Sequence, residues 1–302
     1  MKILTTTSTF STKIDIPGAE VIHNPNKRRL TEQEIGEMIE KHQPVAIIAG
    51  VEPITREVLK KAENLKIISR CGVGLDSVDL AAAAEMGIRV ANTPDAPTVS
   101  VAELTIALIL NLLRNVNACD SRMRAGAWPT NHGFELKGKQ VGLIGCGRIG
   151  TCVAGLLKAF GCRILGYDPF VAEHPVCRMV ELDELLRCSD IVSLHIPFTR
   201  ENKHIIGANE LGLMKNSALL INVARGGLVD EDALYAALKQ NTIAGAAMDC
   251  FAVEPYKGKL AELQNIILTP HMGSGTREAR MQMEQQALDH VIAELRGLGM
   301  TT

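Results

Sequence analysis

Short apolar segments alternate with helical segments along almost the whole chain, and this alternation restricts the possible folds strongly. In the first third, five segments rich in β-branched residues predict strands, namely KILTTT, AEVIH, VAIIAG, KIISRC and IRVAN. Helical segments at residues 31–41, 55–62 and 79–86 separate them. Strands that alternate with helices in this way predict a parallel sheet with helices on both faces.

A second alternating series begins at GKQVGLIG. Its later strands are expected at residues 163–167, 191–195, 218–223, 243–248 and 266–268. Residues 96–125 predict one long helix between the two series, because apolar residues recur there at three- and four-residue spacing, and residues 277–296 predict a final helix. The predicted fold class is therefore α/β, with two doubly wound parallel-sheet domains, one of them a Rossmann nucleotide-binding domain.

Length, charge and cysteine spacing exclude several other classes of protein. With 302 residues the chain is long enough for two domains. Because 32 basic residues stand against 34 acidic ones, the chain has no net positive charge to attract nucleic acid. The longest apolar run, at residues 104–113, is shorter than the roughly 18 residues that span a bilayer, and the N-terminus lacks a secretory signal. The eight cysteines show no Cys-x-x-Cys spacing, so we expect free thiols, no metal site and a cytoplasmic location.

The segment GCGRIG follows an apolar strand and precedes a helix, as in dinucleotide-binding proteins. Gly145 permits the tight turn, Gly147 lets a diphosphate approach the backbone, and Gly150 allows the helix to pack closely on the strand. The diphosphate would bind at the N-terminus of the helix, where backbone N–H groups favour negative charge. Such glycine patterns also occur in ordinary turns, so the pattern alone is weak.

Asp168 strengthens the dinucleotide interpretation and indicates which dinucleotide is bound. It ends the second strand, RILGYD, 18 residues after Gly150, where a carboxylate accepts hydrogen bonds from the ribose hydroxyls. The same carboxylate would repel a 2'-phosphate, so we expect NAD as the cofactor in preference to NADP. The alternative is an Asp that only caps the strand.

Three later segments carry residue types suited to the oxidation of a 2-hydroxy acid, each just after a predicted strand. Arg225 in INVARGGLVD could bind a carboxylate through two hydrogen bonds, and His271 in LTPHMGSGT could exchange the hydroxyl proton. Glu254 in AMDCFAVEP would orient the imidazole and stabilise its charged form. Taken singly, each could also be an ordinary loop residue. His195, which ends the strand IVSLHIP, is a further candidate for the cofactor cleft.

Taken together, the ordered motifs resemble the D-isomer-specific 2-hydroxyacid dehydrogenase family, near its D-3-phosphoglycerate dehydrogenase branch. The resemblance runs from about residue 65 to residue 280. It rests on RCGVGLDSVD, VANTPDAPTVSVAELTIALIL, VGLIGCGRIG, YDP, LHIPFT, NVARGGLVDEDAL, AMDCFAVEP and TPHMGSGT.

The resemblance assigns roles to individual residues. It implies that Arg225, Glu254 and His271 are catalytic, with His271 as the acid-base group. It implies that backbone N–H groups of the RCGVG loop bind the substrate carboxylate, a loop that contains Arg70, Cys71, Gly72, Val73 and Gly74. The implied cofactor contacts are Gly145, Gly147, Arg148, Ile149, Gly150, Asp168, His195, Pro197, Val223, Ala224, Asp249 and Gly273.

The resemblance also implies the organisation of the whole protein. A smaller, flavodoxin-like substrate domain is expected at residues 1–95 and 278–302, and the NAD-binding Rossmann domain at residues 96–277. A homodimer formed through the nucleotide domains is expected. Because the sequence ends at Thr302, we expect no C-terminal regulatory domain.

The implied function is NAD-dependent hydride transfer between nicotinamide and C2 of a small D-2-hydroxy acid or 2-oxo acid. The natural substrate stays open. Relatives that act on phosphoglycerate often carry a basic residue where this chain has Ala49 or Gly50, so a glyoxylate or hydroxypyruvate reductase is an alternative. An alternative of another class is an NAD-sensing binding protein like the co-repressors that share this architecture.

Overall fold

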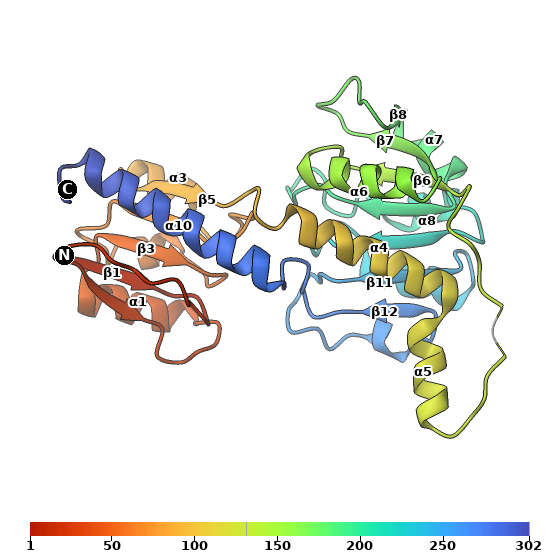
Figure 1. The fold of residues 1–302 in the computed structure, drawn as a ribbon, viewed down its shortest axis with the longest axis horizontal. Coiled ribbons are helices and arrows are strands. Elements are labelled where there is room, and N and C mark those ends of the chain that lie inside the picture. Colours follow the sequence, from red (N-terminus) through yellow and green to blue (C-terminus); the bar gives the residue numbers. More distant parts are fainter. Residues whose placement is uncertain (131, 302) are drawn as a thin grey trace. The chain divides into compact units, whose positions relative to one another are not determined.

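The computed structural model describes residues 1–130 and 132–301, which form two compact units (Figure 1). The first unit comprises residues 1–97 and 274–302, and the second comprises residues 98–273. These divisions lie within a few residues of the expected ones. The assignment of substrate binding to the first unit and its bounds remain a proposal.

The first unit contains one five-stranded parallel sheet with the strand order β2-β1-β3-β4-β5. Its strands are β1 (Lys2–Thr5), β2 (Glu20–His23), β3 (Ala46–Ala49), β4 (Ile67–Arg70) and β5 (Arg89–Asn92). From β1 the chain first adds a strand on one side, β2, and then adds β3, β4 and β5 on the other side. The strand order thus reverses between β1 and β3, as in flavodoxin-like domains. In such sheets ligands bind beside the carboxyl ends of the strands at this reversal.

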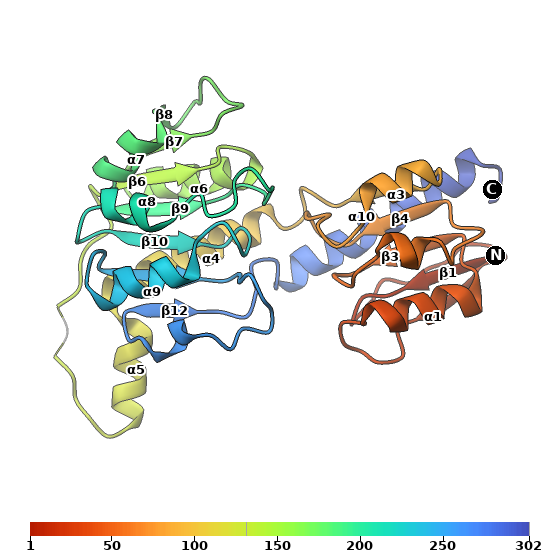
Figure 2. The same cartoon turned by 180° about the vertical axis from the view of Figure 1, so that it is seen from behind.

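Helices cover both faces of this sheet. They are α1 (Glu32–His42), α2 (Arg56–Leu59), α3 (Leu80–Glu85) and α10 (Arg277–Gly297). All of β3 is buried, and its side chains alternate: Ile47 packs in the cluster that includes α1 to α3, whereas Ile48 packs against α10. Figure 2 shows α1 and α3 in front of the strands and α10 behind them. The final predicted helix therefore completes the core of the first unit.

The second unit contains a seven-stranded parallel sheet with the order β12-β11-β10-β9-β6-β7-β8. Its strands are β6 (Gln140–Ile144), β7 (Arg163–Tyr167), β8 (Arg178–Met179), β9 (Ile191–Leu194), β10 (Leu219–Asn222), β11 (Gly245–Met248) and β12 (Ile266–Leu268). The order reverses between β6 and β9, which is the Rossmann arrangement extended by one strand. The predicted α/β fold class with two parallel-sheet domains is confirmed.

The helices of the second unit also lie on both faces of its sheet. They are α4 (Thr98–Arg114), α5 (Val116–Arg124), α6 (Arg148–Ala159), α7 (Leu182–Cys188), α8 (Ala208–Leu213), α9 (Glu231–Lys239) and the 3-10 helix Lys259–Glu262. Leu143 of β6 packs in the cluster with residues of α4 and α6. Ile144 beside it packs in the cluster with residues of α7, α8 and α9. The parallel strands are thus buried on both faces, as their apolar sequences require.

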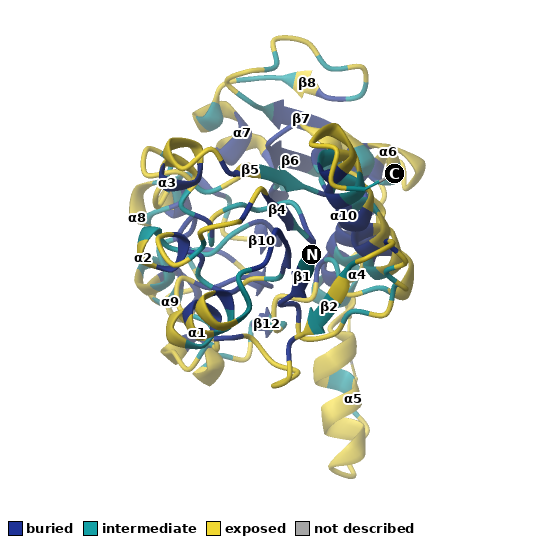
Figure 3. Cartoon of the chain, turned by 90° about the vertical axis from the view of Figure 1, so that its left-hand side faces the viewer, coloured by how far each residue is buried: buried dark blue, intermediate teal, exposed yellow. Residues whose placement is uncertain are grey.

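The prediction of a single helix over residues 96–125 is wrong, because the helix is interrupted at Asn115. This residue has a φ of 52°, a left-handed conformation that Asn tolerates better than most residues, and α4 and α5 are bent by 62° there. The apolar periodicity also stops at the break, since α5 buries none of its residues (Figure 3). Among the described residues no single helix is long and apolar enough to cross a membrane; only the bent α4 and α5 pair passes that test jointly.

Candidate active site

The three catalytic candidates lie on loops that follow three neighbouring strands of the second unit. Arg225 follows β10, Glu254 follows β11 and His271 follows β12. Because these strands are parallel and adjacent, their carboxyl ends meet at one edge of the sheet. This edge is where doubly wound sheets bind ligands.

His271 and Glu254 form a direct pair. Nδ1 of His271 lies 3.0 Å from Oε1 and 3.0 Å from Oε2 of Glu254. The N–H of Phe251 donates to Oε1 at 3.1 Å and thereby fixes the carboxylate. Nε2 of His271 has no hydrogen-bond partner in the described chain. With Nδ1 held by the carboxylate, Nε2 is the ring nitrogen left for proton exchange with a ligand.

The loop that carries His271 is held by a buried carboxylate. Asp249 is fully buried and accepts hydrogen bonds from Thr269 Oγ1 at 2.6 Å, from the N–H of Met272 at 2.9 Å and from the N–H of Gly273 at 2.9 Å. His271 itself has a φ of 52°, which residues other than Gly adopt rarely and which is enriched at functional sites. Asp249 therefore positions this loop, and its contact with the cofactor remains a proposal, as does that of Gly273.

Arg225 is placed by Asn222, the buried last residue of β10. Asn222 Nδ2 donates to the carbonyl of Arg225 at 2.9 Å, and its Oδ1 accepts the N–H of Ala224 at 3.1 Å. The next residue, Gly226, lies so close to Phe251 that a Cβ would be 1.9 Å from the Phe251 carbonyl oxygen. Since the Phe251 N–H binds Glu254, and Glu254 pairs with His271, these contacts link all three loops.

The glycine motif has the geometry that a dinucleotide requires. Gly145 has a φ of 102°, and a Cβ on Gly150 would lie 2.0 Å from the Gly145 carbonyl oxygen. A Cβ on Gly147, in contrast, would meet no atom within 4 Å. Helix α6 begins after Gly147 without a side-chain cap, so its first N–H groups suit a diphosphate.

Asp168 and His195 border the same motif. Asp168 Oδ2 accepts the N–H of Cys146 at 2.9 Å and Oδ1 accepts that of Phe170 at 3.0 Å, which leaves each oxygen able to accept a ribose hydroxyl. His195 donates its N–H to Ile144 at 2.7 Å, where the strand order reverses. Burial lowers the pKa of His195 to about 3, so its imidazole is neutral. Its Nδ1 is buried without a hydrogen-bond partner in the described chain.

The RCGVG loop of the first unit follows β4. Burial raises the pKa of Cys71 to about 12, so this thiol is not a nucleophile. Two of the expected donors are already used: the Cys71 N–H donates to Ala49 at 2.9 Å and the Gly72 N–H donates to Thr93 Oγ1 at 2.7 Å. Among the described residues, the N–H groups of Val73 and Gly74 have no partner, so they are the donors left for a carboxylate.

The remaining predicted residues lie at the same edge of the second sheet. Arg148 and Ile149 open α6, and Pro197 is exposed after β9. Val223 and Ala224 are buried directly after β10. Their contacts with a cofactor remain proposals, as does a contact of Arg70 with a substrate. In the described part of the chain, no group of His, Cys, Asp and Glu side chains could hold a metal ion.

Sequence reasoning missed the residues that hold the candidates in place. Asn222 positions Arg225 and Thr93 holds Gly72, whereas Glu52, a carboxylate that is 1% exposed beside β3, forms its hydrogen bonds with Thr6 and Gly50 outside the candidate set. Asn222 lies within the motif NVARGG and could have been noticed. Thr93 lies 21 residues from Gly72 and Glu52 lies 46 residues from Thr6, and no local pattern marks either of them.

Comparison with known proteins decides the family. The family model described as D-isomer specific 2-hydroxyacid dehydrogenase, NAD binding domain, matches residues 106–273, more than half of the chain. The chain belongs to this family. The family expected from the sequence is thus confirmed, and with it NAD as the cofactor, because the matched region is the family's NAD-binding domain.

Members of the family with several names resemble the chain. D-3-phosphoglycerate dehydrogenase of Methanocaldococcus jannaschii is 45% identical over 88% of this chain and 51% of its own length. Glyoxylate reductase of Thermococcus litoralis is 40% identical over 87% of this chain and 84% of its own length. The crystal structure of D-lactate dehydrogenase from Aquifex aeolicus, complexed with NAD and lactic acid, is 28% identical with a TM-score of 0.84, covering 98% of this chain and 96% of that one.

The phosphoglycerate dehydrogenases are much longer than this chain. The chain spans 51%, 58% and 54% of three of them, which is about half of their length. Their activity therefore does not transfer to this chain by similarity alone.

Proposed function

We propose that the chain is an NAD-dependent oxidoreductase that transfers a hydride between nicotinamide and C2 of a small D-2-hydroxy acid or 2-oxo acid. The observation that carries this proposal is the pair of His271 and Glu254 on the ligand-binding edge of a sheet that also bears the dinucleotide motif. The names of the relatives, which include reductases and dehydrogenases of such acids, agree with it.

The chain's own residues supply proton transfer and charge stabilisation. NAD, when bound, accepts or supplies the hydride at C2. In the reductive direction, Nε2 of His271 donates a proton to the oxygen on C2, and Glu254 stabilises the charged imidazolium that precedes this transfer. In the oxidative direction Nε2 accepts the hydroxyl proton. Arg225 stabilises negative charge on the substrate, which it suits because its guanidinium binds carboxylate oxygens in pairs.

Residues of the first unit are proposed to bind the substrate carboxylate. The Val73 and Gly74 N–H groups follow β4 at the carboxyl edge of the sheet, and the carboxamide of Asn92 donates to the Val73 carbonyl at 2.6 Å, which fixes the loop. Successive backbone N–H groups in a turn form a favourable site for an anion.

We also propose that the protein is a homodimer in the cytoplasm. Helix α5 buries none of its residues, and it exposes Val116 by 57% and Met123 by 51%. Beside it, Leu112, Phe134 and Ile266 line a groove of the same unit. A second copy of the chain would cover this apolar surface. All eight cysteines are free thiols, which suits a reducing compartment.

The proposed activity is tested by following reduced nicotinamide absorbance with a panel of 2-oxo acids. NADH and NADPH are compared with each acid, and glyoxylate, hydroxypyruvate and phosphohydroxypyruvate are included. We expect turnover of at least one acid and a preference for NADH, because Asp168 repels a 2'-phosphate. Tight NADH binding without turnover of any acid would favour the NAD-sensing alternative.

A further inference from the structure

One buried carboxylate near the ligand-binding edge of the first unit plays no part in the proton transfer described above. Glu52 follows β3, beside the reversal between β1 and β3, and is 1% exposed. Its Oε1 accepts hydrogen bonds from the Thr6 hydroxyl and from the Gly50 N–H, the latter at 2.9 Å. Thr6 directly follows β1, so both strands that flank the reversal contribute to this contact.

The second oxygen of Glu52 is left over. In the described chain Oε2 has no hydrogen-bond donor, and it lies beside Gly50, where a Cβ would be 2.7 Å from it. No Lys, Arg or His of the described residues forms an ion pair with Glu52. A buried carboxylate costs free energy unless a cation or sufficient donors compensate it. Oε2 can therefore accept a further hydrogen bond, which a ligand at this edge would supply.

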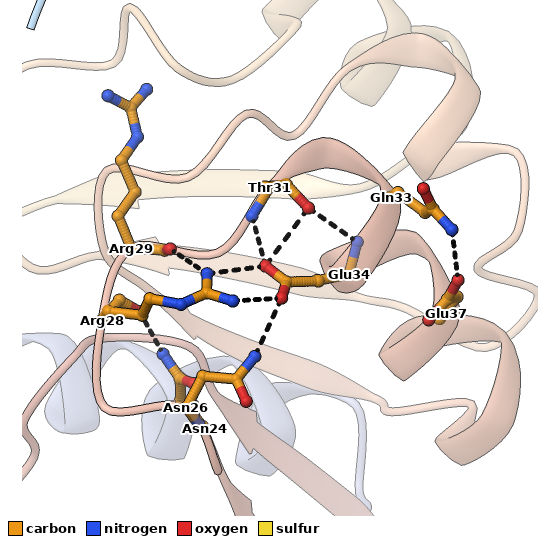
Figure 4. Close-up of polar contacts among 8 residues, drawn as sticks. All are labelled: Asn24, Asn26, Arg28, Arg29, Thr31, Gln33, Glu34 and Glu37. Carbon is orange, nitrogen blue, oxygen red and sulfur yellow. Dashed lines mark hydrogen bonds and ion pairs between the residues drawn. The ribbon is translucent and has the colours of Figure 1, made fainter.

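Arg28 lies in the loop that Asn24 connects to Thr6, and it pairs with a carboxylate other than Glu52. Arg28 forms a double ion pair with Glu34, with distances of 2.9 Å and 2.5 Å, and Figure 4 shows Arg29 extending away from that pair. Arg28 holds the pKa of Glu34 near 2, so the pair persists at neutral pH. The carboxamide of Asn24 connects this loop to Thr6, donating to the Thr6 carbonyl at 3.0 Å and to the Arg28 carbonyl at 2.8 Å.

Two further arginines are likewise committed. Arg70 donates to the carbonyl of Cys71, and Arg280 binds Glu284 at 2.7 Å and the carbonyl of Thr9. Neither arginine forms an ion pair with Glu52, so at this edge the buried carboxylate lies among hydroxyl and amide groups. A phosphate placed there would meet a carboxylate of the same sign.

Glu52 lies near the backbone N–H groups that are proposed to bind the substrate carboxylate, because they follow neighbouring strands. Val73 and Gly74 follow β4, and Glu52 follows the adjacent strand β3. Neighbouring strands are about 4.8 Å apart, a span that the third carbon of a 2-oxo acid and its substituent can cover. A substrate held by its carboxylate beside β4 would therefore direct that substituent toward Glu52.

We propose that Glu52 selects substrates that carry a hydrogen-bond donor beyond C2, a hydroxyl or an ammonium group, and disfavours substrates that carry a phosphate there. This inference rests on the proposed function and names its substrate class. The donor would bind Oε2 of Glu52 and complete the hydrogen bonding of the buried carboxylate.

The test measures kcat/KM of the full chain with NADH and four 2-oxo acids. Pyruvate and hydroxypyruvate differ only in the hydroxyl on C3, phosphohydroxypyruvate replaces that hydroxyl by a phosphate ester, and glyoxylate has no third carbon. We expect hydroxypyruvate to exceed pyruvate by roughly 10²-fold, since a site built to bind a hydroxyl rejects the analogue that lacks it. We expect it to exceed phosphohydroxypyruvate by a similar factor, because like charges placed together cost several kcal/mol.

Substitution E52Q removes the charge while preserving the shape of the side chain. We expect the preference for hydroxypyruvate over phosphohydroxypyruvate to fall about tenfold or more, which corresponds to about 1.4 kcal/mol. Turnover of glyoxylate should change by less than about threefold, because glyoxylate does not reach Glu52. E20Q is the matched control, since Glu20 is exposed at the amino end of β2, on the opposite edge of the same sheet. NADH affinity and the unfolding temperature of each variant report that the fold is retained.

The outcomes separate this inference from the proposed function. Lack of turnover with all four acids refutes the proposed function and this inference with it. Turnover of glyoxylate with equal use of pyruvate and hydroxypyruvate refutes the role of Glu52 alone. A wild-type preference for phosphohydroxypyruvate also refutes the role of Glu52. Both of these results are obtained with the wild-type protein, so they do not depend on the folding of a variant. If a folded E52Q protein prefers hydroxypyruvate over phosphohydroxypyruvate as strongly as the wild type, the role of Glu52 is refuted as well.

Discussion

His271 differs from His204 and His195 in the groups that surround its imidazole. His204 also lies near a carboxylate, but its Nδ1 is 3.6 Å from a single oxygen of Asp230, whereas His271 lies 3.0 Å from both oxygens of Glu254. His195 is neutral because burial lowers its pKa to about 3. Among these three, only His271 combines a carboxylate partner, an available Nε2 and a place at the carboxyl edge of the NAD-binding sheet. This combination of features supports the proposed proton-transfer role.

Replacing His271 by Ala should lower kcat by roughly 10²- to 10⁴-fold, the usual contribution of a general acid-base group. Steady-state oxidation of NADH measures this effect, and NADH affinity should stay near that of the wild type. His204→Ala is the matched control, because both histidine side chains are 41% exposed and both are near a carboxylate. Equal activity of the His271 variant and the wild type would remove His271 from the mechanism.

Gly147 offers a test at one residue of the cofactor site. A Cβ at this position meets no protein atom within 4 Å, so Gly147→Ala should fold normally. If a diphosphate occupies that space, the methyl group should weaken NAD binding about tenfold, or about 1.4 kcal/mol. Titration calorimetry with NAD measures the affinity. Gly155→Ala, also without neighbours within 4 Å, is the control within the same helix. Equal affinities for both variants would place the diphosphate elsewhere.

At the scale of elements, α10 depends on a buried ion pair. Glu284 has a side chain that is 1% exposed and pairs with Arg280 at 2.7 Å. Its Oε2 accepts the N–H groups of Ser11 at 2.8 Å and Thr12 at 2.9 Å. This carboxylate therefore joins the last helix to the segment after β1 and helps to complete the first unit.

Acid should weaken this contact. Burial alone would raise the pKa of Glu284, but the hydrogen bonds from Ser11 and Thr12 and from Arg280 outweigh it, so the folded pKa lies below the ordinary 4.5. A lowered folded pKa stabilises the fold above about 4.5, and this stabilisation is lost as pH falls through the folded pKa. We expect E284Q to lower the free energy of unfolding by roughly 1–3 kcal/mol at pH 7.

Urea unfolding between neutral pH and pH 3 measures this difference for the wild type, E284Q and the exposed control E278Q. The gap between wild type and E284Q should narrow as pH falls, whereas E278Q should follow the wild type. A gap that is constant with pH would show that Glu284 stabilises the helix by shape alone.

The elements also show what could be predicted from sequence. Strands such as residues 163–167 and 266–268 match β7 and β12, because buried parallel strands are continuous apolar runs between turn residues. The long helix at residues 96–125 failed because the left-handed Asn115 leaves no strong signal in the sequence. Strand β8, only Arg178–Met179, was missed because two residues cannot show a period.

The candidate site was predictable to a similar degree. Arg225, Glu254 and His271 each follow a strand in a distinctive motif, so their positions at one edge could be inferred. The contacts of Asp249 and Thr93 could not, because they join residues 20 or more positions apart in the sequence. Glu52 was missed because one of its two hydrogen-bond partners, Thr6, lies 46 residues away in sequence.

At the scale of the whole molecule, each of the two units has its own reversal of strand order at which a ligand can bind. In the second unit this reversal carries the glycine motif, and in the first it carries Glu52. Two sheets of this kind in one chain suit an enzyme that holds a cofactor and a substrate. The proposed dimer adds a further level, in which a second copy of the chain would cover the exposed Val116 and Met123 of α5.

Substituting an exposed apolar residue of α5 should dissociate the dimer without unfolding the chain. Met123 is 51% exposed, so Met123→Glu should shift the mass in light scattering from dimer to monomer at micromolar concentration. Phe170→Glu is the control, because Phe170 is 93% exposed after β7 in the same unit. A wild-type monomer, or equal dissociation of both variants, would contradict the proposed interface.

Transfer of deuterium tests the central claim most directly. NADH carrying deuterium on the reactive face of C4 is incubated with the preferred 2-oxo acid, and the product is analysed by mass spectrometry and chiral chromatography. We expect one deuterium at C2 of a hydroxy acid of D configuration. Product without deuterium at C2, or of L configuration, would contradict direct hydride transfer by a member of this family.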